Sequence, residues 1–417
     1  MPSVNKYTLP KHSHFQDFII IEDPAISILE KRAFEIDKRL NEEVLAYTPP
    51  NSYEKLKFRS LLFESFAISK AEGSSLKLTD AKKILKVLSQ GKKVEFQKMK
   101  LSSTDALYRK KEYLNIIKAI KRTNGLSAND ISIQTIKELH AVASHDLDSF
   151  KETEGQKYNI GRLRLNADQI AIYDSITGEI IYEPPTEAII EPALQSIFLW
   201  IKQKQKITPY DISIFHTLLY SIHPFSNGNK RSVRILEHLL MKETGLNKHG
   251  FYNISFYYHE YIERYYKYLL EAITMKQLRN WSIFFLEGVI YMLFDTIRKS
   301  IELERLDNAK RHYNYRKIKD NKNAIKIIQA LSEKKYMQTK ALNRVATISR
   351  QALISNLNKL IELKLVTREV FMDNKKNQYK LNYESPNEVL LKDEIEKIID
   401  MYHRIPIGEK TLNCLGL

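Results

Sequence analysis

Residues 223–234 read HPFSNGNKRSVR, and the segments on either side of this stretch have helical patterns. Thr208 and Pro209 are typical of a helix start, a capping residue followed by proline in the first turn. Apolar residues then recur every three or four positions, at Ile212, Phe215, Leu219 and Ile222. A proline and a glycine inside the stretch interrupt the pattern, which resumes at residue 229 and runs to about residue 243. The sequence therefore predicts a helix, a tight loop and a second helix over residues 208–245.

The loop contains the residue types of a phosphate site. Gly228 and Asn229 lie where loop becomes helix, and the free N–H groups of a helix N-terminus attract phosphate. Arg231 and Arg234 are three positions apart and share a helix face, and arginine binds phosphate oxygens bidentately. His223 has an ordinary pKa near neutrality and suits the role of a base. The residues alone indicate a phosphate-binding loop, with a structural histidine and a solvated basic helix face as the alternative.

The segment resembles the signature of the Fic (filamentation induced by cAMP) family, His-x-Phe-x-Asp/Glu-Gly/Ala-Asn-Gly/Lys-Arg-x-x-Arg. The positions that agree are His223, Phe225, Gly228, Asn229, Lys230, Arg231 and Arg234. The resemblance implies that His223 deprotonates a target hydroxyl and that Phe225 anchors the loop in the core. It also implies an ATP triphosphate held by the loop N–H groups and by Gly228, Asn229, Lys230, Arg231 and Arg234.

Two positions depart from the commonest family pattern. Asn227 stands where the family has Asp or Glu to bind the Mg²⁺ that bridges the phosphates, and a neutral amide is a poorer ligand for this hard cation. Asn227 is therefore a weak candidate metal ligand, and we expect Mg²⁺ to bind weakly. Lys230 is typical of the Doc-like branch, whose members transfer the γ-phosphate as kinases. The resemblance thus leaves AMP transfer, phosphotransfer and AMP removal open, with AMP transfer preferred because Arg234 is present.

Residues 68–73 read ISKAEG and resemble the family's inhibitory motif, Ser/Thr-x-x-x-Glu-Gly/Asn. Glu72 and Gly73 agree with the motif, whereas Ile68 stands where Ser or Thr is expected. The resemblance implies that a helix over residues 59–73 brings the Glu72 carboxylate to Arg234 and inhibits the enzyme. A Glu-Gly pair at a helix end is also a common helix cap.

Residues 170–173 and 179–182 have strand-like patterns on either side of a turn-like segment, which predicts a β-hairpin. The resemblance implies that this hairpin is the family's flap, which binds a segment of the target protein as an added strand. Further along, Ser255, Tyr257, Tyr265 and Tyr266 resemble the family's region near the nucleotide base. A packed aromatic cluster is the simpler interpretation of most of these tyrosines.

Composition favours a mainly α protein of two or three domains, because 417 residues contain only 12 Gly and 12 Pro. The single cysteine, Cys414, excludes an intramolecular disulfide, and no signal peptide is recognisable at the N-terminus. The longest apolar stretch, residues 281–294, is too short to span a bilayer. We expect a cytoplasmic protein without a membrane partner.

The net charge of +16 is concentrated near the C-terminus. Residues 310–382 contain 18 Lys and Arg against 5 Asp and Glu, a net charge of +13. Their pattern of three short helices and two strands resembles a winged helix-turn-helix domain. The segment is therefore a candidate DNA-binding module, with protein docking or dimerisation as the alternative. Candidate phosphate contacts are Arg350, Lys359, Lys375 and Lys376, and the residues expected in the core are Ile348, Leu353 and Leu357.

The fold expected is a Fic-type helical core with a β-hairpin flap and a C-terminal winged helix-turn-helix domain. The predicted divisions are an N-terminal helical region (1–110), a Fic core (111–308), a winged-helix-like domain (309–383) and a C-terminal tail (384–417). The function expected is that of a protein adenylyltransferase acting on a Ser, Thr or Tyr hydroxyl. The alternatives are a Doc-like phosphotransferase, a de-AMPylase, and a DNA-binding regulator with a degenerate Fic core. Fic proteins of this layout often dimerise, so the resemblance also implies a homodimer.

Overall fold

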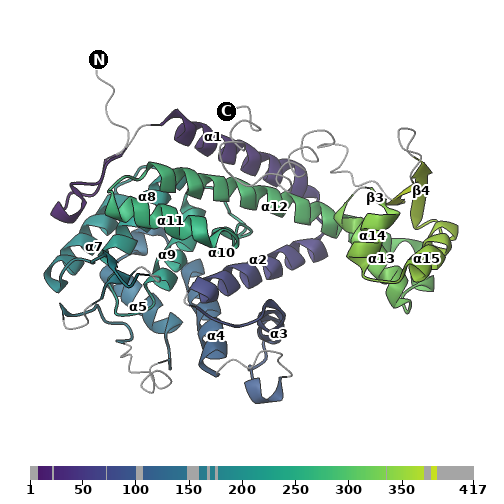
Figure 1. The fold of residues 1–417 in the computed structure, drawn as a ribbon, viewed down its shortest axis with the longest axis horizontal. Coiled ribbons are helices and arrows are strands. Elements are labelled where there is room, and N and C mark those ends of the chain that lie inside the picture. The colour runs from purple at the N-terminus through teal and green to yellow at the C-terminus, as the bar shows by residue number, and fades with distance from the viewer. Residues whose placement is uncertain are drawn as a thin grey trace. The chain divides into compact units, whose positions relative to one another are not determined.

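The computed structural model is mainly α-helical (Figure 1). It describes residues 8–20, 23–71, 73–99, 107–147, 159–166, 170–173, 177–334, 336–370 and 377–382. In this part of the chain no helix is both long and apolar enough to cross a membrane. The chain divides into two compact units, one of residues 1–35 and 58–292 and the other of residues 36–57 and 293–416.

The helices of the first unit, including two that extend beyond it, are α1 (Pro24–Arg39), α2 (Pro50–Ala71), α3 (Leu78–Ser89), α4 (Leu107–Arg122), α5 (Ile133–Ala143), α7 (Glu187–Lys202), α8 (Pro209–Ile222), α9 (Asn229–Glu243), α10 (Ile254–Glu260) and α11 (Ile262–Thr274). A further helix, α12 (Arg279–Arg311), begins in this unit and ends in the other. The centre of the unit is α8, which packs against α7, α9 and α11 and has every residue buried. Both helices beside the loop, α8 and α9, begin and end where the sequence predicted them.

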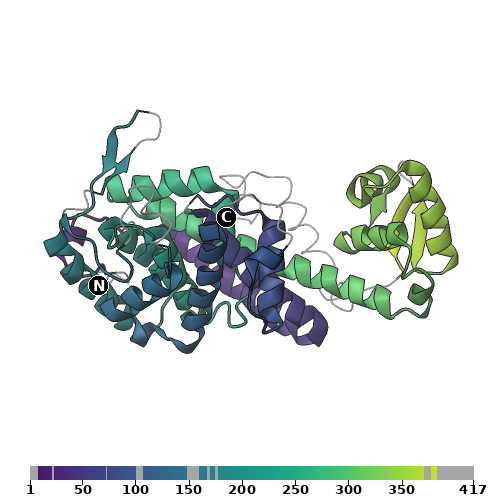
Figure 2. The ribbon, with the colours of Figure 1, turned by 90° about the horizontal axis from the view of Figure 1, so that it is seen from below.

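The predicted hairpin is present as two short antiparallel strands, β1 (Ile172–Tyr173) and β2 (Ile180–Tyr182). Figure 2 shows it projecting from the helices of its unit. Tyr182 ties the hairpin to α8, since its hydroxyl donates a hydrogen bond to the carbonyl of Ser221 at 2.8 Å. The hairpin is therefore fixed near the end of α8, directly before the loop.

Two helical segments of this unit are irregular. Helix α1 ends at Arg39, and the chain continues as a π-helical turn, Leu40–Val44. Residues 254–274 form two helices, α10 and α11. Tyr261 separates them with φ −117° and ψ 45°, outside the helical region. Apolar periodicity does not reveal such a break, because both helices bury tyrosines.

The C-terminal part of the second unit contains α13 (Lys322–Glu333), α14 (Thr339–Ala346) and α15 (Arg350–Glu362). The strands β3 (Met337–Gln338), β4 (Val366–Val370) and β5 (Asn377–Leu381) form an antiparallel sheet of order β3-β5-β4. The three helices and the last two strands follow the predicted order, and the short strand β3 was missed. Leu353 and Leu357 are in the core as expected, and the partly buried Ile348 packs against it.

Candidate active site

The helix before the loop ends in an unusual backbone conformation. Thr208 caps α8, as the sequence predicted, and Asp211 completes a capping box with it. The helix ends at His223, whose φ of 51° and ψ of 61° are left-handed. A non-glycine residue in this region costs free energy and often marks a functional site. The His223 ring is half-buried and lies edge-on to the Tyr220 ring, with centroids 5.4 Å apart.

Gly228 ends the loop and is the N-cap of α9. Its φ of 76° is left-handed, which favours glycine. A Cβ atom at this position would lie 2.8 Å from Nη2 of Arg231 and 3.1 Å from Nε2 of His140. Gly228 therefore allows two side chains to approach the loop backbone closely.

Asn229, the first residue of α9, holds the loop closed. Its Oδ1 accepts a hydrogen bond from the Phe225 N–H at 2.9 Å, and its Nδ2 donates to the Phe225 carbonyl at 2.7 Å. The Phe225 ring is fully buried, so the expected core anchor is confirmed. In this structure the Asn229 amide thus positions the loop backbone.

Arg164, which lies before the loop in the sequence, hydrogen-bonds to the backbone at the end of α8 and in the loop. Its side chain donates to the carbonyl of His223 at 2.7 Å and to the carbonyls of Pro185 and Ile222. Its own N–H donates to the carbonyl of Pro224 at 2.9 Å. This buried cation therefore stabilises the end of α8 and fixes where His223 lies.

His140 on α5 supports the other side of the loop. Its ring is stacked on that of Phe225, with centroids 3.9 Å apart and planes 7° apart. Nδ1 accepts a hydrogen bond from the Gly161 N–H at 3.0 Å, so Nε2 carries the proton and donates to the Asn227 carbonyl at 3.0 Å. These contacts define a neutral imidazole that holds the loop.

The three predicted cations contact different elements. Arg231 is fully buried and pairs with Oε1 of Glu112 on α4 at 2.6 Å. Lys230 donates to the Tyr266 hydroxyl at 3.0 Å and lies over that ring. Arg234 is only 1% exposed, and its guanidinium carbon lies 5.1 Å from the ring centroid of Tyr258 and 4.7 Å from that of Tyr265.

The sequence left two interpretations of the tyrosines after residue 255, a region near the nucleotide base or a packed aromatic cluster. In the structure they form a packed cluster. Tyr257, Tyr258 and Tyr265 are buried and pack on one another or on Trp281 and Phe284. Two of its members, Tyr258 and Tyr265, present their ring faces to Arg234, and ring faces attract cations.

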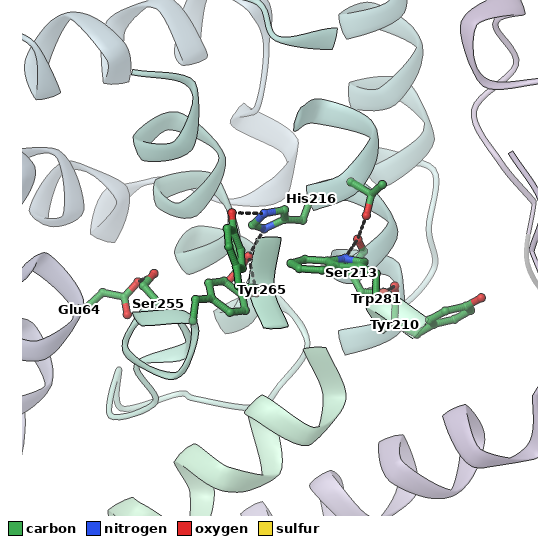
Figure 3. A network of polar contacts seen from close by, with 10 residues as sticks. Glu64, Tyr210, Ser213, His216, Ser255, Tyr265 and Trp281 are labelled. Carbon is green, nitrogen blue, oxygen red and sulfur yellow. Dashed lines mark hydrogen bonds and ion pairs between the residues drawn. The ribbon is translucent and has the colours of Figure 1, made fainter. Parts of the chain in front are cut away.

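Buried carboxyl groups lie near the same arginine. Glu237 stands one helical turn after Arg234, and burial raises its pKa to about 8, against the attraction of Arg234. Burial likewise raises the pKa of Glu64 on α2 to about 8, although a hydrogen bond from the Ser255 hydroxyl and the charge of Arg234 oppose the rise. That hydrogen bond, 2.6 Å long, is drawn in Figure 3.

The residues present do not fit a magnesium ion held by the protein. Asn227 supplies a neutral amide where a carboxylate would be the preferred ligand. The described part of the chain contains no group of three His, Cys, Asp or Glu residues that could hold a metal ion. The weak metal binding expected from the sequence therefore stays a prediction, and we assign no step to a metal.

The expected inhibitory glutamate, Glu72, lies outside the described residues, so its position stays a prediction. The helix before it, α2, does reach the site. The carbonyl of Ala67 accepts a hydrogen bond from Nη1 of Arg234 at 3.3 Å, and Ile68 is fully buried. This end of α2 thus packs against the last arginine of the motif.

The structure brings the predicted loop residues together and adds four that the sequence reasoning missed: Glu112, His140, Arg164 and Glu237. Glu112 and Glu237 are charged residues on helix faces otherwise rich in apolar side chains, a signal that could have identified them. His140 and Arg164 carry no such signal, because their contacts with the loop join residues far apart in sequence. The assembled site offers a histidine, a helix N-terminus and a buried arginine, a combination suited to transfer of a phosphate-containing group.

Comparison with known proteins agrees with this chemistry. Residues 130–241 match the family model described as the Fic/DOC family. Over 73 residues the chain is 36% identical to a protein of Aquifex aeolicus (strain VF5) named as a probable protein adenylyltransferase. That match covers 17% of this chain and 23% of the relative, so the chain matches less than a quarter of the relative's length.

The fold is also similar to that of a Fic family protein from Desulfovibrio desulfuricans G20, with a TM-score of 0.52. The similarity covers 91% of this chain and 99% of that chain at 16% identity, which shows the fold alone. The sequence signature, the helix–loop–helix geometry and the family model all identify the same segment. The chain therefore contains a Fic/DOC family domain, over residues 130–241.

Proposed function

We propose that this protein is an adenylyltransferase that moves AMP from ATP onto a Ser, Thr or Tyr hydroxyl of a protein. The observation that carries the proposal is the geometry of the loop, which places His223 at the end of α8 and the N-terminus of α9 directly after Gly228. The Fic/DOC domain and the relative named as a probable protein adenylyltransferase support it.

In this reaction His223 accepts the proton of the target hydroxyl. The hydroxyl oxygen then forms a bond to the α-phosphorus, and the bond from that phosphorus to the oxygen bridging to the β-phosphate breaks. Pyrophosphate leaves with the electron pair. A positioned base contributes about 10²–10⁴-fold to such a step. The α9 N-terminus and Arg234 supply positive potential for the phosphates.

Phosphotransfer and AMP removal are the alternatives within the same site, and Lys230 favours the first of them. Intact-mass measurement after incubation with ATP and Mg²⁺ separates the three. A mass gain of one adenylyl group supports the proposal, and a gain of one phosphate supports phosphotransfer. Loss of AMP from a previously adenylylated protein supports removal. No change in mass under any condition favours the remaining alternative, a DNA-binding regulator with a degenerate Fic core.

We further propose that the α2 helix inhibits the enzyme through Glu72. The contact between the Ala67 carbonyl and Arg234 supports this proposal, because Glu72 follows five residues later on the same segment. A carboxylate paired with Arg234 would compete with phosphate for the same guanidinium. Glu72→Gly should therefore raise self-modification by about 10-fold, which requires only about 1.4 kcal/mol of lost inhibition. Equal rates for both proteins would contradict an inhibitory role.

DNA binding by the C-terminal segment is a second candidate function. Helices α14 and α15 are joined by residues 347–349, in which Thr347 is left-handed with φ 50°. A three-residue turn between two helices is typical of helix-turn-helix DNA-binding proteins. Exposed residues of α15 are Arg350, Gln351, Ile354, Ser355, Asn358, Lys359 and, at its end, Glu362. Amides can hydrogen-bond adenine edges and an exposed isoleucine can contact a thymine methyl, so this face suits the major groove.

Fluorescence anisotropy of a labelled random duplex with the full chain tests this second function. Binding that weakens steeply with salt is expected, because phosphate contacts release counterions. Arg350→Ala should reduce binding to all sequences, whereas the double variant Gln351→Ala, Asn358→Ala should mainly reduce any sequence preference. No binding at low salt would contradict the proposal and favour protein docking.

A further inference from the structure

Arg234 is a buried cation without a carboxylate partner among the residues that the structure describes. It is 1% exposed, and within the described ranges Nε and Nη2 have no hydrogen-bond partner. A buried guanidinium without a carboxylate partner lowers the free energy of unfolding, since charged groups taken out of water are normally paired. Nη1 donates a hydrogen bond to the Ala67 carbonyl at 3.3 Å. The guanidinium is thus held in place with two of its nitrogens available.

A closed ring of four side chains in contact, Tyr258, Glu237, His216 and Tyr265, lies beside this guanidinium. Tyr258 and Tyr265 present their faces to it, and both tyrosine hydroxyls continue into further contacts. The Tyr258 hydroxyl donates to Oε2 of Glu237 at 3.0 Å, and the Tyr265 hydroxyl lies 3.2 Å from Nε2 of His216. His216 and Glu237 close the ring, with Nδ1 and Oε2 2.5 Å apart. In Figure 3 a dashed line joins His216 to the Tyr265 hydroxyl.

Burial shifts the pKa of two titratable groups in this ring, Glu237 and His216. Burial raises the pKa of Glu237 to about 8, although Arg234 and the Tyr258 hydroxyl oppose the rise. Burial lowers the pKa of His216 well below its ordinary value, with Arg234 adding to the effect. Both shifts favour the uncharged forms of the two side chains. Each of them also contacts a tyrosine hydroxyl, Glu237 that of Tyr258 and His216 that of Tyr265.

We propose that Glu237 and His216 are positioning residues that hold Tyr258 and Tyr265 against Arg234 and so present its free nitrogens to the phosphates of the nucleotide. This inference rests on the proposed function, because it takes an ATP-like triphosphate as the ligand. Neither residue touches the ligand. Each residue orients a tyrosine ring, and the two tyrosine rings orient the Arg234 guanidinium. The expected consequence is tighter binding of the phosphate groups and no change in binding of the nucleoside.

Two substitutions break the ring at separate points. Tyr258→Phe retains the ring face but removes the hydroxyl bonded to Glu237. Glu237→Gln retains the size of the side chain. In the wild type, the contacts of Glu237 with His216 and with Tyr258 are both made by the same atom, Oε2. An amide carries its donor and its acceptor on different atoms, so glutamine cannot reproduce both contacts at one atom. Tyr113→Phe is the matched control, because it also removes a buried hydroxyl, bonded to Ser65 at 3.2 Å.

The experiment is calorimetric titration of the wild type and the three variants with ATP and, separately, with adenosine. We expect Tyr258→Phe and Glu237→Gln to weaken ATP binding by about 10-fold, which is about 1.4 kcal/mol, while adenosine binding stays unchanged. Tyr113→Phe should change neither affinity. Circular dichroism melts identify a variant that fails to fold, and if Glu237→Gln fails, Tyr258→Phe still tests the ring.

The outcomes separate the inference from the function on which it rests. Unchanged ATP affinity in folded Tyr258→Phe overturns the inference and leaves the proposed function intact. Equal weakening for ATP and adenosine also overturns it, because the ring would then have only a structural role. Absence of ATP binding by the wild type contradicts both the inference and the proposed function.

Discussion

The side-chain amide of Asn229 bonds both polar groups of the Phe225 backbone, at 2.9 Å to the N–H and 2.7 Å to the carbonyl. This pairing closes the loop between α8 and α9 into a fixed shape. Asn229, which the sequence predicted to bind phosphate, therefore stabilises the backbone conformation of the loop that forms the site.

Asn229→Asp should reduce both activity and stability. It replaces the amide donor with an oxygen that faces the Phe225 carbonyl, so we expect a loss of about 1–3 kcal/mol in the free energy of unfolding. Asn247 provides a matched control, since its amide makes the same pair of contacts with the Tyr252 backbone, at 2.9 and 3.4 Å. Urea unfolding and transfer assays should show Asn247→Asp destabilised but active. Full activity of folded Asn229→Asp would contradict the role of this contact in the site.

Gly228→Ala should be more destabilising than an equivalent change elsewhere. Alanine at a left-handed position costs about 1–2 kcal/mol in any setting. Here the added Cβ would also lie 2.8 Å from Nη2 of Arg231, whose pairing with Glu112 it would disturb. Gly245→Ala is the control, because its φ is 85° and nothing lies within 4 Å of the added atom. Equal losses of unfolding free energy in the two variants would show that the approach of Arg231 is unimportant.

Helix α8, the loop and α9 could be predicted because their limits depend on local residues. Thr208 and Pro209 mark the beginning of α8, and Gly228 marks the point at which α9 begins. The supports of the loop could not be predicted, since Arg164 and His140 reach it only after folding. The break at Tyr261 has no local sequence signal either, because it lies within one continuous pattern of aromatic residues.

Glu64→Gln should change how stability depends on pH. The pKa of Glu64 is raised to about 8 in the folded protein, so the folded state binds more protons than the unfolded state above the ordinary pKa of 4.5. Its contribution to stability is complete below pH 4.5 and is lost as the pH rises to about 8. Glutamine keeps an acceptor for the Ser255 hydroxyl and does not ionise. The variant should therefore gain stability relative to the wild type between pH 5 and 8 in urea unfolding, and parallel curves would contradict the assignment.

Asn227→Asp should increase the affinity for Mg²⁺ in the presence of ATP. A carboxylate offers a charged oxygen ligand where the wild type has an amide, and hard cations prefer the former. Activity at low Mg²⁺ should rise with it. Metal titrations that superimpose for the two proteins would show that residue 227 does not contact the metal.

The central claim is that the protein transfers AMP from ATP to a protein hydroxyl, with His223 as the base that accepts the hydroxyl proton. Parallel reactions with ATP labelled at the α- or the γ-phosphate test it most directly, using the wild type, Glu72→Gly and the same proteins carrying His223→Ala. The account predicts protein labelling from α-labelled ATP only, strongest in Glu72→Gly. His223→Ala should abolish that labelling while ATP binding persists, because the change removes the base and leaves the phosphate-binding helix N-terminus. Labelling from γ-labelled ATP, or labelling that survives His223→Ala, would contradict the account.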